Sequence, residues 1–147
     1  MRRGWYSLIL AMMNELLEER RILAEDNKYK VYSVYESVYL IDKYNQNKSH
    51  KFIAWIYGDP KGAIISKDQK YIVVSGYGIS IYYLDEQLGE SQLSFFDDPD
   101  NSKYTCGLHQ NEIDDKSLNF FRFVSYNDKQ EPRVFRMNAH NFQWEEL

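Results

Sequence analysis

Residues 63–87, AIISKDQKYIVVSGYGISIYYLDEQ, carry the clearest structural signal in the chain. They contain a polar turn at SKDQ, an apolar run at KYIVVS, a glycine turn at GYG and a second apolar run at ISIYYL. Short apolar runs rich in β-branched and aromatic residues, and bounded by turn residues, are typical of β-strands. This stretch therefore predicts a β-hairpin from Tyr71 to Leu84.

The same pattern occurs in two other parts of the chain. Each copy consists of a strand-like run, then Asp or Asn, then a polar turn; the copies are VYLIDKYNQ (38–46), IYYLDEQLG (81–89) and VFRMNAHNF (134–142). Asp42, Asp85 and Asn138 occupy equivalent positions. A repeat spacing of about 40–50 residues is typical of four-stranded propeller blades.

Residues 63–87 thus resemble a β-propeller repeat. Propellers typically need four or more blades to close, and about 120 residues of strand-like sequence supply at most three. We therefore expect an ordinary hairpin in a mixed meander rather than part of a ring. The predicted fold is α+β and mainly β, a single domain over residues 1–147 with an antiparallel meander over about 29–147.

The N-terminal segment predicts an amphipathic helix over about residues 5–24 that packs on this meander. Its apolar residues fall three and four positions apart, which places them on one helical face: Trp5, Leu8, Ile9, Met12, Met13, Leu16, Leu17 and Leu23. Three glutamates on the polar face, Glu15, Glu18 and Glu19, argue against a membrane-surface helix. No apolar run of about 18 residues is present, so we expect no membrane partner.

The sequence contains no motif that indicates catalysis, a metal or a cofactor. Cys106 and His109 have the spacing of a zinc-binding pair, but the additional ligands that zinc needs are missing from their neighbourhood. His50 and His140 lie in polar turns. A nucleophile elbow, a P-loop and a dinucleotide fingerprint are all lacking. We therefore predict a chain that is not an enzyme. With one cysteine it has no internal disulfide, which fits a cytoplasmic protein.

Charge gives the one indication of a partner. Residues 85–115 contain nine acidic residues and a single basic residue, Lys103, whereas the remaining residues contain 13 acids and 17 bases. Such a segment repels nucleic acid and attracts a basic protein. It also contains aromatic residues that could anchor a partner. The predicted partner-binding residues are Phe95, Phe96, Asp97, Asp98, Asp100, Tyr104, Asp114 and Asp115, the alternative being a solvated loop.

In overall character, small, acidic and rich in aromatic residues, the chain is similar to bacterial immunity proteins of contact-dependent inhibition and other polymorphic toxin systems. This resemblance implies binding to a cognate basic toxin, often a nuclease, whose active site the acidic surface would cover. Two alternatives stay open. One is an oligomerising β-sheet subunit that associates through its edge strands. The other is a small-molecule-binding domain or enzyme with a pocket under the tyrosines.

Overall fold

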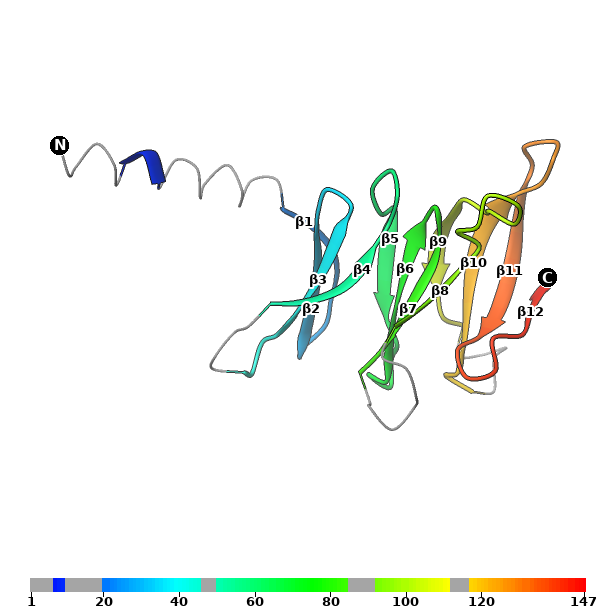
Figure 1. Cartoon of the computed structure of the whole chain (residues 1–147). Coiled ribbons are helices and arrows are strands. Elements are labelled where there is room, and N and C mark those ends of the chain that lie inside the picture. Colours follow the sequence, from blue (N-terminus) through cyan, green and yellow to red (C-terminus); the bar gives the residue numbers. More distant parts are fainter. Residues whose placement is uncertain (1–6, 10–19, 46–49, 85–91, 112–116) are drawn as a thin grey trace.

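In the part of the chain that the computed structural model describes, twelve strands form three four-stranded antiparallel sheets (Figure 1). The structure describes residues 7–9, 20–45, 50–84, 92–111 and 117–147. The first sheet contains β1 (Arg20–Glu25), β2 (Tyr29–Val34), β3 (Ser37–Asp42) and β4 (Lys51–Trp55). The second contains β5 (Gly62–Ile65), β6 (Tyr71–Gly76), β7 (Gly78–Tyr83) and β8 (Gln92–Phe95). The third contains β9 (Thr105–His109), β10 (Phe120–Tyr126), β11 (Pro132–Asn138) and β12 (Trp144–Glu146).

The second sheet is packed between the other two, and both of its faces are buried. On one face Ile72, Val74 and Tyr82 join a core cluster with residues of the first sheet. On the other, Tyr71, Val73 and Ile81 join a cluster with residues of the third sheet. Every residue of β6 and β7 is consequently buried, whereas β10 alternates between buried and half-buried positions along most of its length. The continuous apolar run of the 71–83 hairpin is thus explained by burial on both faces.

The three sheets are arranged like neighbouring blades of a β-propeller. In each sheet the strands follow one another in sequence order. The first strands of neighbouring sheets also contact each other, β1 with β5 and β5 with β9. Radial repetition of four-stranded sheets, with the first strands at a common centre, defines the propeller architecture.

The mainly β character and the antiparallel hairpins are confirmed, but the hairpin over residues 71–84 belongs to one of three similar four-stranded sheets, so the expectation of an ordinary hairpin outside any blade-like repeat is wrong. The three sequence repeats overlap β3, β7 and β11, so each copy marks the third strand of one sheet. Asp85, one of the equivalent positions, lies outside the described residues. The error came from the length argument, which applies to closure of a ring. Neighbouring blades can bury their faces against one another whether or not a ring is closed.

The predicted helix over residues 5–24 is wrong at its C-terminal end. Residues 20–24 belong to β1, where Arg20, Arg21 and Ile22 pair with the end of β2. Of the rest, residues 7–9 are helical and exposed, and residues 5–6 and 10–19 lie outside the described residues. In the described part of the chain, no helix has the length and apolar character needed to cross a membrane.

Buried and partly buried hydrogen bonds join the second and third sheets. The Tyr83 hydroxyl donates to the carbonyl oxygen of Ala139 at 2.6 Å. The Tyr71 hydroxyl donates to the carbonyl oxygen of Leu118 at 2.7 Å. At the start of β9, the Thr105 hydroxyl donates to the carbonyl oxygen of Gly78 at 2.9 Å. These bonds fix the position of one sheet relative to the other, because each satisfies a polar group that packing has removed from water.

Because the Tyr83 hydroxyl is buried, we expect the free energy of unfolding to fall with rising pH in the alkaline range. Burial raises the pKa of Tyr83 to about 12. Because the pKa in the folded state exceeds the unfolded value of about 10, this group's stabilisation is complete below pH 10 and is lost as the pH rises to about 12. We expect Tyr83→Phe to lower the free energy of unfolding at pH 7 by about 1 kcal/mol and to reduce the loss between pH 10 and 12. Urea unfolding across this pH range measures both, and an unchanged alkaline loss in the variant would contradict the assignment.

Candidate binding face at the loop end of the sheets

The connections between neighbouring sheets lie at the same end of the strands as one set of hairpin turns. Because each sheet is an antiparallel meander, alternate connections fall at the same end. This end, called the loop end below, comprises residues 35–36, 56–61, 77, 96–104 and 127–131. In Figure 1 these connections lie along the upper edge of the three sheets. The loop end is therefore one face to which all three sheets contribute.

Four aromatic side chains form a continuous row across the loop end. The ring centroids of Trp55 and Tyr57 are 6.3 Å apart, those of Tyr57 and Tyr77 are 5.8 Å apart, and those of Tyr77 and Tyr104 are 5.4 Å apart. The exposed fractions of Trp55, Tyr57 and Tyr104 are 55%, 60% and 53%. This aromatic row starts at the end of β4, crosses the turn between β6 and β7, and ends just before β9.

The GYG turn explains why the row is continuous. Tyr77 lies between Gly76 and Gly78, which both have positive φ angles, 153° and 86°. The Gly78 amide donates to the carbonyl oxygen of Lys103 at 2.8 Å, and Tyr77 forms an isolated β-bridge with Tyr104. The hairpin turn of the second sheet is thereby joined to the segment that leads into the third. The two tyrosine rings meet as a consequence.

The aromatic row lies in an acidic setting. Seven carboxylates and three lysines belong to the loop end, giving it a net charge of −4; they are Glu36, Asp59, Asp97, Asp98, Asp100, Asp128 and Glu131, with Lys61, Lys103 and Lys129. Surface charge of one sign raises the local concentration of oppositely charged molecules. The loop end therefore carries an excess of negative charge around the aromatic row.

The predicted partner-binding residues separate into three groups. Asp97, Asp98, Asp100 and Tyr104 are exposed in the 96–104 connection, where Asp98 Oδ1 accepts a hydrogen bond from the Asp100 amide at 3.1 Å. Phe95 and Phe96 are half-buried and pack against the core of the second and third sheets. Asp114 and Asp115 lie outside the described residues. Of the aromatic residues proposed as anchors, Tyr104 is the exposed one.

Three members of the row, Trp55, Tyr57 and Tyr77, were missed by sequence reasoning. Each lies at or just beyond the end of a predicted strand, beside the turn residues Gly58, Asp59 and Pro60 or inside GYG. An aromatic residue in a turn is a usable signal, because a turn gives it little core to pack against. The contact of Tyr77 with Tyr104, which is far away in sequence, depends on how the sheets pack.

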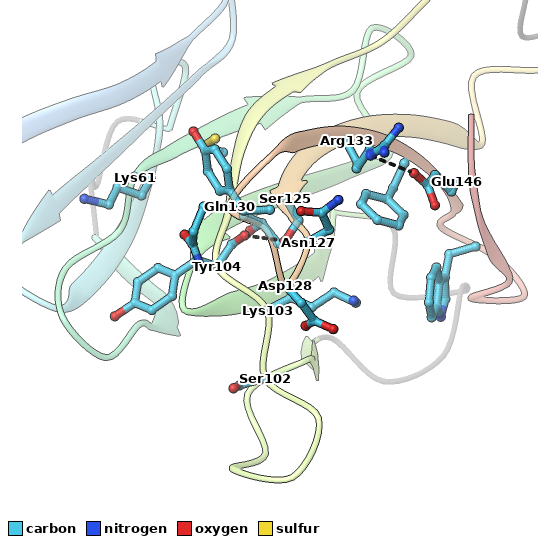
Figure 2. Close-up of a pocket in the computed structure, with 15 residues that line it drawn as sticks. Lys61, Ser102, Lys103, Tyr104, Ser125, Asn127, Asp128, Gln130, Arg133 and Glu146 are labelled. Atoms are coloured by element: carbon cyan, nitrogen blue, oxygen red, sulfur yellow. Dashed lines mark hydrogen bonds and ion pairs between the residues drawn. The ribbon is translucent and has the colours of Figure 1, made fainter.

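Two cavities open near the row. The larger, about 970 Å³, has walls formed by the 102–106 segment and by parts of β10, β11 and β12 (Figure 2). Figure 2 shows the Arg133–Glu146 ion pair at one side of it, with a nitrogen–oxygen distance of 3.5 Å. The smaller, about 350 Å³, is lined in part by Trp55, Tyr57 and Tyr77. Volumes of 300–1,000 Å³ are typical of small-molecule sites.

His50 and His109 form hydrogen bonds with residues of their own sheets. His50 Nδ1 hydrogen-bonds to the Tyr32 hydroxyl in the first sheet, and His109 Nδ1 to the carbonyl oxygen of Gly107 at 2.8 Å in the third. Cys106 is a half-buried free thiol. Within residues 7–9, 20–45, 50–84, 92–111 and 117–147, no group of three or more His, Cys, Asp or Glu side chains is arranged to hold a metal ion.

Comparison with known proteins finds one informative similarity, and it is at the level of the fold. No protein-family model and no curated protein matches the sequence. Among solved structures, the chain is similar to a "putative 6-phosphogluconolactonase" from Bacteroides uniformis, with a TM-score of 0.51 and 12% sequence identity. The alignment covers 86% of this chain and 40% of that chain. At this identity the similarity shows a shared fold alone.

This similarity corrects the prediction that the chain is not an enzyme. That prediction rested on the lack of local catalytic motifs in the sequence. The described fold is shared with a protein named as a lactonase, so missing motifs do not place the chain outside enzyme folds. Sites on such scaffolds are assembled from loops of several sheets, and short sequence motifs do not reveal them.

Proposed function

We propose that the loop end is a binding face for a basic protein partner, with the aromatic row as its central contact. The observation that carries this proposal is the row itself. Four aromatic rings in successive contact span all three sheets, and three of them are more than half exposed. A row of this kind exposes a large apolar area that gains free energy when a partner covers it.

The row also has the properties of a preorganised interface. Tyr and Trp are the residues most enriched among those that dominate binding energy. Here neighbouring rings and the GYG turn hold the side chains in place, so binding immobilises them at little entropic cost. The surrounding net charge of −4 favours a basic partner and repels the phosphates of nucleic acid.

The specific role we propose is that of an immunity protein. A basic toxin domain, such as a nuclease, has a cationic active site, and an acidic face bearing aromatic anchors would cover it by steric and electrostatic occlusion. Asp97, Asp98 and Asp100 would speed the encounter, because charges at the rim of an interface act mainly on the association rate. Tyr104 and the rest of the aromatic row would then determine how slowly the complex dissociates.

The double variant Tyr57→Ser/Tyr104→Ser tests this proposal. Proteins captured by the wild-type chain from its native cell would be identified, and the dissociation constant of the main basic partner would be measured by calorimetry at 0.15 M salt. We expect the double variant to bind that partner at least about tenfold more weakly, because it removes two exposed rings from the row.

Tyr44→Ser is the matched control. Tyr44 is 70% exposed but follows β3, at the end of the sheets opposite to the loop end. We expect this control to bind the partner like the wild type. Equal weakening by the control and the double variant, or no weakening by the double variant, would show that the aromatic row is not the contact surface.

A second candidate function is the binding or conversion of a small molecule in the larger cavity. Its volume of about 970 Å³ is suitable, and Lys61, Lys103 and Arg133 line it together with carboxylates and aromatic rings. The fold shared with a protein named as a lactonase supports the same candidate. A ligand of this cavity would raise the unfolding temperature of the chain as its concentration increases.

A further inference from the structure

Lys103 inserts its ammonium group between three aromatic rings. Its Nζ atom lies 5.9 Å from the ring centroid of Phe96, 5.4 Å from that of Phe135 and 5.5 Å from that of Trp144. All three distances are within the range of about 6 Å in which a cation is attracted to an aromatic face. Phe96, Phe135 and Trp144 are called the aromatic cage below.

The rings of the cage face one another at steep angles, as the walls of a cation site do. Phe96 and Trp144 are 5.4 Å apart with an interplanar angle of 87°, and Phe135 and Trp144 are 5.9 Å apart at 62°. Phe135 is buried and Trp144 is 47% exposed, so the cage has a closed base and an open side. Lys103, Phe135 and Trp144 also line the larger cavity, which gives a ligand access to the cage.

The side chain of Lys103 can leave the cage without any movement of its backbone. The Lys103 amide donates to the carbonyl oxygen of Phe96 at 3.0 Å, and its carbonyl oxygen accepts from the Gly78 amide at 2.8 Å. Rotation about side-chain bonds alone therefore moves Nζ out into the cavity. In the described part of the chain Lys103 forms no ion pair with a carboxylate, so departure from the cage breaks no salt bridge.

The cavity beside the cage is lined by charges of both signs, the cations being Lys61, Lys103 and Arg133. Asp128 and Glu146 both line it, and Glu146 is already paired with Arg133. Asp128 forms no ion pair among the described residues. An ammonium ion in the cavity would thus meet a carboxylate on its way to the rings.

We propose that the aromatic cage is a binding site for organic ammonium ions, and that Lys103 is a built-in competitor that occupies it until such a ligand displaces the lysine side chain. Aromatic cages recognise alkylammonium groups because the negative faces of the rings stabilise a cation that has lost its water. The natural ligand we assign is a lysine side chain of the basic partner. This assignment of the ligand rests on the proposed function, whereas the site itself does not.

The alternative to this proposal is that Lys103 only anchors the 96–104 connection to the third sheet. The two differ in the effect of removing the lysine side chain. An empty cage gains affinity for an added cation if the cage is a binding site held by a competitor. If the lysine is only an anchor, its removal loosens the connection and no cation binding appears.

Lys103→Ala tests the proposal by removing the competitor. Choline would be titrated into the full-length protein, and the dissociation constant obtained from the NMR signal of its methyl groups. We expect Lys103→Ala to bind choline at least about tenfold more tightly than the wild type, since cation–π contacts with several desolvated rings are worth about that much. Adding Trp144→Ala to this variant should abolish the gain, and the neutral isostere 3,3-dimethyl-1-butanol should bind to none of the proteins.

Lys129→Ala is the control for the loss of one positive charge, because Lys129 lies at the loop end but outside the cage. Choline affinity no higher in Lys103→Ala than in this control, or equal binding of the neutral isostere, would overturn the proposal. If near-UV circular dichroism shows that Lys103→Ala is unfolded, Lys103→Gln serves in its place, because it removes the charge and keeps most of the side-chain stem.

A second titration identifies the source of the ammonium group. Nα-acetyl-lysine methylamide represents a lysine side chain of a protein partner, and choline represents a free ammonium ion. Binding of the lysine analogue to Lys103→Ala supports the partner lysine as ligand. Binding of choline without the lysine analogue would overturn that assignment and would leave a small-molecule cation site. Neither titration contains the partner, so failure of the proposed partner binding cannot be confused with failure of the cage.

Discussion

Replacing Phe123 with alanine is expected to lower the free energy of unfolding by about 3–5 kcal/mol. Phe123 is fully buried in β10, between the second and third sheets. Its ring stacks on Phe135 at 5.3 Å and contacts Phe121 at 6.3 Å and Phe96 at 6.2 Å. Truncation would leave a cavity among these rings, and the surrounding side chains can fill it only in part. A loss of this size is a large fraction of the stability of a typical domain.

Urea unfolding of Phe123→Ala and of Phe52→Ala measures this effect. Phe52 is the matched control because it is 49% exposed in β4 of the first sheet. We expect the control to lose no more than about 1 kcal/mol, since its ring gives up little buried area. Similar losses for the two variants would mean that the contact between the second and third sheets is not the core of the fold.

Gly78→Ala is expected to cost about 2 kcal/mol or more. Gly78 has a φ of 86°, which disfavours any residue with a Cβ atom. A Cβ at this position would also lie 2.6 Å from the carbonyl oxygen of Phe95 and 3.0 Å from Cβ of Asp97, both in the segment at the end of β8. The chain would have to move where the GYG turn meets the 96–104 connection. The substitution should therefore also disturb the contact between Tyr77 and Tyr104.

Gly62→Ala is the matched control for this substitution. Gly62 begins β5, its φ is not positive, and an added Cβ would find its nearest neighbour, the Ser75 hydroxyl oxygen, at an ordinary distance of 3.7 Å. Thermal unfolding of the two variants separates strain from a general effect of adding a methyl group. A Gly78→Ala protein as stable as Gly62→Ala would contradict the role assigned to the GYG turn.

Local features of the fold could be predicted from the sequence because they depend on neighbouring residues. The hairpin expected from Tyr71 to Leu84 is present as β6 and β7, and the three repeats mark equivalent strands. Stacking of the sheets was not predictable in the same way. Tyr32 in β2 pairs with Tyr39 in β3 because a short turn joins the two strands. The packing of Ile72 against the first sheet depends instead on residues that are far away in sequence.

Of the candidate site, the sequence indicated the acidic residues and Tyr104, but not the rest of the aromatic row. Asp97, Asp98 and Asp100 form a compact run in the sequence, so charge alone revealed them. The aromatic row joins Trp55 to Tyr104, and no local pattern connects these positions. Phe96 turns inward at a residue with a φ of 58°, which brings its ring against Phe123 and Trp144. Phe96 belongs to the cage because of this backbone conformation and because β12 places Trp144 beside its ring.

Hydroxyl-radical footprinting of the chain alone and bound to its captured partner would test the binding face most directly, because it reports the accessibility of individual aromatic side chains. We predict that Trp55, Tyr57 and Tyr104 become protected in the complex, while the labelling of Tyr44 and Phe52 stays unchanged. Protection of Tyr44 or Phe52 with the aromatic row still labelled would place the partner elsewhere and contradict the proposed role of the loop end.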